Sequence, residues 1–179
     1  MPPVHPALVH FPIALVTFSF VADLLGHLRD SASLRAAGFW AMVGAALSST
    51  LTVAAGYVDM NRATLGEVHD YVDFHMYVGW VMFVAVVLLT LWRWFLYAKT
   101  ERRAGWSYLV PALLVLALTA FQGWFGGEMV YAKGAGIAET GKGVEPPNAS
   151  HRRIDWVMNL LGVEHRHGGG QNSNRHDEH

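Results

Sequence analysis

Histidines are the residues of this sequence best suited to chemistry. The chain has ten histidines and no cysteine, which excludes disulfides, thiolate metal sites and cysteine-held iron–sulfur clusters. His5, His10, His69 and His75 lie at or beside apolar runs. A neutral imidazole can ligate haem iron or a divalent metal. An ionisable group in a membrane segment indicates a functional site, so these four histidines are the first candidates.

Four apolar runs position these histidines. They cover residues 8–25, 38–58, 74–92 and 106–127, and each approaches or exceeds the roughly 20 residues of helix that cross a hydrocarbon layer. The whole chain is 53% hydrophobic and only 15% charged. We therefore predict an all-α, integral membrane, antiparallel four-helix bundle. Its seams need small residues, which the second run offers at Ala45, Ser49, Thr52 and Gly56. The net charge of −1 provides no basic field, which excludes nucleic acid as a partner.

The basic residues predict the orientation of the bundle. Lys and Arg favour the cytoplasmic side of short loops, and six of them flank the first and third connections: Arg29, Arg35, Arg93, Lys99, Arg102 and Arg103. The second connection contains Arg62 among several acidic residues. Both termini are therefore expected outside.

This topology brings polar groups from four segments to the outer end of the bundle. His5 and His10 belong to the first helix, and Asp59 ends the second. Thr64 and Glu67 form a potential capping box, so the third helix is expected to start early enough to contain both His69 and His75. Glu128 and Tyr131 lie at the outer end of the fourth helix.

The pattern favours a b-type haem with two histidine ligands, because imidazoles on facing helices supply both axial positions. His10 and His75 are the best pair, since each lies two or three residues inside its apolar run. Gly79, one turn from His75, leaves space for a flat macrocycle. Asp59 is placed to accept an imidazole N–H.

Alternatives remain open for the other histidines. His5 and His69 form a second haem pair, ligate another cofactor, or lie among the lipid headgroups. In a second interpretation, all four histidines belong to a Zn or Cu site instead. His27 is given a structural role, and Asp23 is either a proton-path residue or a hydrogen-bonded carboxylate near the inner surface.

Proline and glycine mark further features of the helices. Pro6 suits a first helical turn. Pro12 leaves the carbonyl of Leu8 without its usual partner and bends the first helix, which is expected to aim His10 inward. The pair Gly126-Gly127 is expected to end the fourth helix.

Composition divides the chain into three parts. Residues 1–137 form the transmembrane domain, and residues 138–164 form an extracytoplasmic segment with a short amphipathic helix. Residues 165–179 are rich in Gly, Asn and His and predict a disordered tail.

The chain also resembles a bacterial family of predicted four-helix membrane proteins known only as a domain of unknown function. The resemblance rests on the opening HPALVHFPIAL of residues 5–15, on Gly56 to Asp59, on His75 to Gly79, and on GGEMVY at residues 126–131 before Gly134 and Gly136. Of the candidates, His5, His10, Asp59 and His75 match these motifs, whereas His69 lies outside them and Glu128 occupies an unspecified position of the last one. Relatives joined to Rieske-type iron–sulfur domains or accompanied by c-type cytochromes imply electron transfer at the outer face.

We therefore expect a multi-pass protein of the bacterial inner (plasma) membrane that carries electrons through one or two b haems near its periplasmic face. Its expected partners are the lipid bilayer and a c-type cytochrome, a Rieske-type protein or a larger membrane complex. It is an electron carrier or oxidoreductase subunit more than a stand-alone enzyme. The alternatives are Zn or Cu binding or transport, and a cofactor-free structural subunit of a respiratory or photosynthetic complex.

Overall fold

A computed structural model describes residues 4–61, 69–99, 105–133 and 152–162, and its regular structure over these residues is entirely α-helical. The helices are α1 (His5–Leu8), α2 (His10–Leu28), α3 (Ala32–Met60), α4 (His69–Lys99), α5 (Trp106–Lys133) and α6 (Arg152–Leu160). Four segments are long and apolar enough to span a membrane: His5–Leu28, Ala32–Met60, His69–Ala98 and Trp106–Tyr131. The predicted all-α class with four spans is confirmed.

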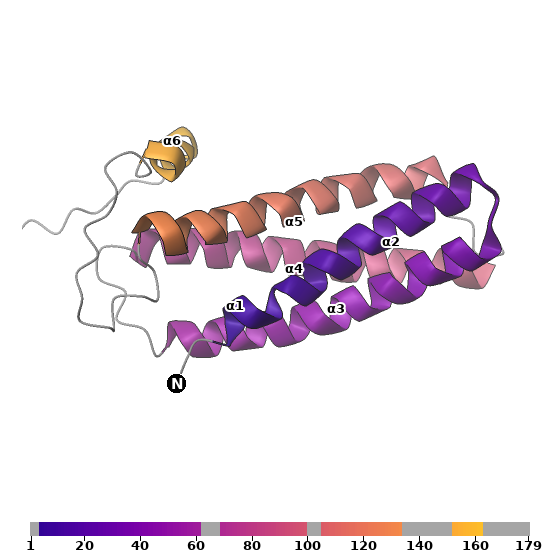
Figure 1. The fold of residues 1–179 in the computed structure, drawn as a ribbon, viewed down its shortest axis with the longest axis horizontal. Helices are drawn as coiled ribbons and strands as arrows, with labels where there is room; N and C mark the ends of the chain where they lie inside the picture. The colour runs from indigo at the N-terminus through magenta and orange to yellow at the C-terminus, as the bar shows by residue number, and fades with distance from the viewer. Residues whose placement is uncertain (1–3, 62–68, 100–104, 134–151, 163–179) are drawn as a thin grey trace, which may run out of the picture.

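The four long helices run up and down in a square (Figure 1). α2 packs against α3 and α5, and α4 packs against the same two helices. α2 and α4 are therefore diagonal partners that run in the same direction. α1 continues α2 towards the N-terminus, at the end of the bundle where α3 and α5 finish.

Small and apolar residues fill the interior of the bundle. The predicted seam of α3 is buried at Ala45, Ser49 and Thr52, which lets the backbones approach closely where lipid supplies no hydrophobic drive. Large apolar side chains cover the outer surface instead, among them Trp40, Leu47, Leu51, Leu88 and Leu114. This inverted pattern is the one expected of a lipid-exposed bundle.

The helices exceed the minimum length of a span. α3 has 29 residues and α4 has 31, so they are about 43 and 46 Å long at 1.5 Å per residue. A hydrocarbon core is about 30 Å thick, and the helices therefore tilt or project into the headgroup layers.

Pro12 breaks the first span into α1 and α2. Because proline has no N–H, the carbonyl of Leu8 loses its helical donor, and the hydroxyl of Thr52 on α3 lies 3.4 Å from that oxygen. Pro6 lies in the first turn of α1, as expected. The expectation that the bend aims His10 inward is wrong, because His10 is exposed and His5 lies against α3 instead.

The glycine pair does not end the fourth span, contrary to expectation, because α5 continues to Lys133. Gly126 instead allows a close interhelical contact. A Cβ at this position would lie 3.0 Å from Cε1 of His75. Glycine at this position provides space for the ring and does not form a turn.

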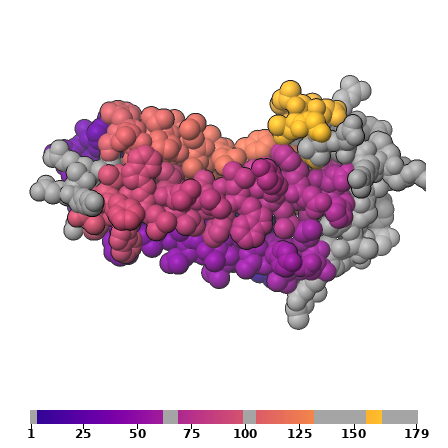
Figure 2. Space-filling model, turned by 180° about the vertical axis from the view of Figure 1, so that it is seen from behind, coloured from indigo at the N-terminus to yellow at the C-terminus, as the bar shows by residue number. Residues whose placement is uncertain are grey.

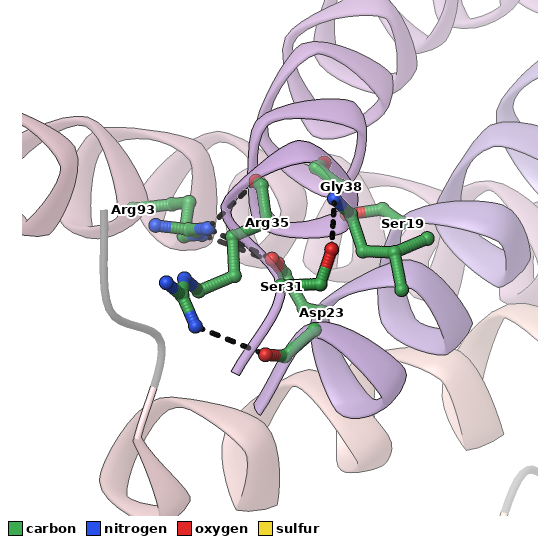
Figure 3. Close-up of polar contacts among 8 residues, drawn as sticks. Ser19, Asp23, Ser31, Arg35, Gly38 and Arg93 are labelled. Atoms are coloured by element: carbon green, nitrogen blue, oxygen red, sulfur yellow. Dashed lines mark hydrogen bonds and ion pairs between the residues drawn. The ribbon is translucent and has the colours of Figure 1, made fainter. Parts of the chain in front are cut away.

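A buried ion pair joins α2 to α4 (Figure 3). Asp23 and Arg93 are both 0% exposed. Arg93 donates from Nε to Oδ2 of Asp23 at 3.2 Å and from Nη2 to Oδ1 at 2.8 Å. Nη2 also donates to the backbone oxygen of Arg35 on α3 at 3.0 Å. Asp23 is thus a hydrogen-bonded carboxylate, one of the two roles considered for it.

Arg35 and Arg93 are not loop residues. Both are buried in helices, although they had been counted among the charges of the connections. Arg35 donates from Nη1 to the oxygen of Gly26 at 3.0 Å and to Asp30 at 2.8 Å. Of the six basic residues used to predict orientation, these two are therefore inside the bundle.

The amphipathic stretch forms α6, which lies at the end of the bundle beside α4 and α5 (Figure 2). Val157 and Met158 are buried in a cluster with Tyr71, Phe125 and Met129. The proposed capping box of Thr64 and Glu67, the glycines at 134 and 136, and the tail 165–179 lie outside the described residues.

Thr52→Val tests the contact that compensates for Pro12. The hydroxyl of Thr52 has one proton, shared between Ser48 at 2.9 Å and Leu8 at 3.4 Å. Because the variant leaves a buried carbonyl of α1 without a donor, it should destabilise the bundle by about 1 kcal/mol. Thr50→Val is the matched control, since exposed Thr50 bonds only to Ala46 of its own helix. Thermal unfolding in detergent measures both, and equal midpoints would contradict this role of Thr52.

Candidate functional site

Two of the candidate histidines meet at one end of the bundle. The rings of His5 on α1 and His75 on α4 have centroids 6.3 Å apart and are nearly perpendicular, at 89°. They come from diagonally opposed spans. The structure thus brings His75 together with His5, whereas the sequence had favoured His10 as its partner.

The orientation of His5 is fixed through both its backbone and its ring. The backbone N–H groups of Val4 and His5 both donate to Oδ2 of Asp59 at 2.8 Å. Nδ1 lies 2.9 Å from the backbone oxygen of Thr52. Because a carbonyl only accepts, Nδ1 carries the proton, and the lone pair of a neutral His5 is on Nε2. The ring therefore offers one nitrogen to a metal or a proton.

Asp59 contributes to the site in a different way from the one expected. It accepts backbone N–H groups at the start of α1, and the oxygen of Thr52 holds the imidazole. Asp59 fixes the N-terminal end of the first span against α3. Its effect on the ring of His5 is therefore indirect.

His75 is held by contacts from α5. Its ring stacks on Phe125 at a centroid distance of 6.1 Å and an angle of 12°. Nε2 of Gln122 donates to the backbone oxygen of His75 at 2.7 Å. Nδ1 of His75 and Oε1 of Gln122 are buried and have no hydrogen-bond partner among the described residues. The site thus contains polar atoms left without partners in an apolar setting.

Glycines on the other two spans make room for both rings. A Cβ on Gly56 of α3 would lie 2.9 Å from Nδ1 of His5, and one on Gly126 of α5 would lie 3.0 Å from Cε1 of His75. A Cβ atom this close to an imidazole ring would force the ring to move. The pair is therefore flanked by backbone on both sides.

The remaining candidates lie away from the pair. His69 is exposed and bonds to Asp73 at 3.0 Å, on the same helix as His75, as predicted. Tyr131 is 84% exposed and lines a surface groove of about 260 Å³ with Glu128. Gly79 accommodates Gln122, whose Nε2 would lie 3.2 Å from a Cβ there. His27 contacts Trp106 edge to face at 5.3 Å, consistent with its structural role.

Sequence reasoning missed Thr52, Gln122 and Phe125. Thr52 had been assigned to a packing seam, and its contribution comes from the backbone oxygen, which no side-chain pattern reveals. Of these three residues, Gln122 could have been identified from the sequence, because an amide in an otherwise apolar span requires a hydrogen-bond partner.

The number of donors limits what the pair can bind. Among the described residues, no group of three or more His, Cys, Asp or Glu side chains is placed to hold a metal ion. Zinc sites take three or four protein ligands, whereas a haem iron with four porphyrin nitrogens needs two at most. Two imidazoles fit the second requirement.

The spacing of the rings is consistent with a shared metal. A metal–imidazole bond is about 2.0–2.1 Å and the centroid lies roughly 1.1 Å behind the nitrogen, so opposed imidazoles on one metal have centroids about 6.3 Å apart. The observed separation is 6.3 Å.

The fold and the site define a class: a four-span membrane protein with two histidines paired at one end of its bundle. Residues 1–139 match the model of DUF2231, described as a predicted membrane protein family. The chain belongs to this family. No curated protein and no solved structure matches it.

Gly56→Ala tests the close contact at His5. The added methyl would displace the ring and weaken its bond to Thr52, so the variant should lose about 1 kcal/mol of stability. Gly44→Ala on the same helix is the control, because its Cβ would meet Leu15 at an ordinary 3.4 Å. Alanine favours helix over glycine by about 0.5–1 kcal/mol, so the control should be neutral or more stable. Thermal unfolding that shows the same gain in both variants would contradict the contact.

Proposed function

We propose that this protein is a membrane-bound b-type cytochrome that transfers single electrons, with His5 and His75 as the axial ligands of one haem. The observation that carries the proposal is the meeting of two imidazoles from diagonal spans at a spacing of 6.3 Å. The absence of a third donor beside them in the described part of the chain favours haem over a Zn or Cu site.

The chain's own groups would bind and orient the cofactor. The bond from His5 to the oxygen of Thr52 presents Nε2 as a ligand and raises its basicity. Phe125 supports the ring of His75, and Gly56 and Gly126 provide the room that the two rings occupy. A bound haem would supply a one-electron Fe(III)/Fe(II) couple whose potential depends on ligands and burial. The apolar walls around the rings would limit access of water.

The position of the pair supports a role in exchange with a partner at one membrane surface. His5 is the first residue of α1, and His75 is six residues from the first residue of α4. A site so close to the helix ends is suited to electron transfer with a c-type cytochrome, a Rieske-type protein or a larger membrane complex. We place this surface on the periplasmic side of a bacterial inner membrane, because the Arg29 and Lys99 connections favour the cytoplasm.

Histidine variants test the ligand assignment. His5→Ala and His75→Ala should each abolish haem binding, because each removes one axial ligand. His10→Ala and His69→Ala should retain it, since both residues are exposed and outside the pair. Pyridine haemochrome analysis of the purified proteins measures the haem content of each variant.

The outcomes separate the three functions considered. Haem in the wild type that survives His5→Ala but not His10→Ala would overturn the assigned pair. Stoichiometric zinc or copper without haem would favour metal binding. A protein that contains neither when made in haem-sufficient cells would favour a structural subunit.

Reporter fusions test the orientation. A C-terminal alkaline phosphatase fusion should be active and a cytoplasmic fluorescent reporter at the same site should be dark, because the end of the bundle with His5 is expected outside. A fusion in the connection between α2 and α3 is the control and should give the opposite result. The reverse pattern would put the histidine pair at the cytoplasmic face.

A further inference from the structure

We propose that Asp23 and Arg93 are positioning residues for the histidine pair: their ion pair fixes the register of α2 against α4 and thereby sets His5 opposite His75. The inference concerns the site of the proposed cytochrome, but it can be tested on the protein without any cofactor.

The two contacts have the same register. Seventy residues separate Asp23 from Arg93, and seventy separate His5 from His75. Both contacts link the first span to the third. Because α1 continues α2 along the first span, a slip of α2 along α4 would also shift His5 relative to His75.

The helical repeat places both α4 residues on one face. His75 and Arg93 are 18 residues apart in an uninterrupted helix, which corresponds to five turns of 3.6 residues and about 27 Å. A rotation of α4 that removed Arg93 from Asp23 would therefore also remove His75 from His5. The geometry couples the two ends.

Direct packing does not set this register. α2 and α4 are diagonal and each packs against α3 and α5, so no ridges and grooves interlock between them. The contacts through the intervening helices are largely apolar and therefore non-directional, apart from hydrogen bonds such as those from Ser19 to Gly38 and from Thr90 to Met42. The ion pair is directional, because its two donor–acceptor bonds match only one placement of the guanidinium.

The surroundings of the ion pair leave few other placements. A Cβ on Gly38 would lie 2.6 Å from Oδ1 of Asp23, so the carboxylate fits tightly against α3. Arg93 also donates to the backbone of Arg35 and lies 5.6 Å from the ring centroid of Tyr108 on α5. A slip by one residue or turn would leave two charges buried and unpaired.

Distance measurements between spin labels test the proposal. The chain has no cysteine, so Phe11→Cys on α2 and Tyr77→Cys on α4, both exposed positions, give two unique labels near the histidine end. Double electron–electron resonance in detergent or lipid then reports the distribution of distances between the spans. The doubly labelled protein is measured with and without the double substitution Asp23→Leu/Arg93→Met. This substitution replaces the ion pair by apolar groups of similar size, a change that is often tolerated.

The expected result is a single narrow distribution with the ion pair present. Without it, the distribution should become at least twice as broad or shift by about 5 Å, one helical turn, while helix content is retained. Arg93→Lys keeps the charge but not the two-point contact of the guanidinium, so its distribution should also broaden. Thr119→Val is the control for loss of a buried polar group, because Thr119 bonds only within α5; its distribution should stay narrow.

An unchanged narrow distribution in Asp23→Leu/Arg93→Met would overturn the proposal and assign the register to apolar packing. If that variant does not fold, Asp23→Asn/Arg93→Gln is measured with the same two outcomes. Because the labels report position without a cofactor, a protein found to bind no haem leaves this test intact.

Discussion

The ion pair of Asp23 and Arg93 is the constraint on which the arrangement of the bundle depends. A charged group inside a membrane span is costly, and each of these two is fully buried, so neither is tolerated without the other. Arg93 contacts Asp23 on α2, the backbone of Arg35 on α3 and the ring of Tyr108 on α5. One side chain of α4 thus reaches all three other spans.

The opposite end of the bundle depends on the break that Pro12 makes in the first span. The break separates α1 from α2, and residues of α3 contact α1. Thr52 contacts the oxygen of Leu8, and Asp59 accepts the N–H groups at the start of α1. His5 lies on this short helix, and the contacts of α1 with α3 set the direction of its ring. The proline therefore explains why the inward histidine is the one before the bend and not His10, which follows it.

Much of the fold could be predicted from the sequence, because length and apolar content decide which segments cross a membrane. The small-residue face of α3 and the common helix of His69 and His75 were predicted for similar reasons. The choice between His5 and His10 was not predictable from depth alone, since it depends on the rotation of the helix on each side of Pro12. Arg93 was misjudged because the sequence alone does not distinguish a charged residue in a loop from one in a buried ion pair when it follows an apolar run. Gly126 was misjudged as a helix end, since the sequence shows that a glycine provides space but not which side chain occupies it.

The bundle has two polar layers, the ion pair of Asp23 and Arg93 at one end and the pair of His5 and His75 at the other. Together they explain how a bundle of mostly non-directional contacts can support a site with directional requirements. About 27 Å separates the layer of Arg93 from that of His75 along α4, close to the thickness of a hydrocarbon core. Between them the interior is filled largely by apolar residues such as Val16, Met42, Val86 and Leu109, which contribute stability but little specificity of register. A site that binds a ligand through both imidazoles would need them held to within about 0.5 Å. The ion pair at one end and the contacts of Asp59 and Thr52 at the other restrict the sliding and rotation that apolar packing leaves free, so the geometry of the site is a property of the whole bundle.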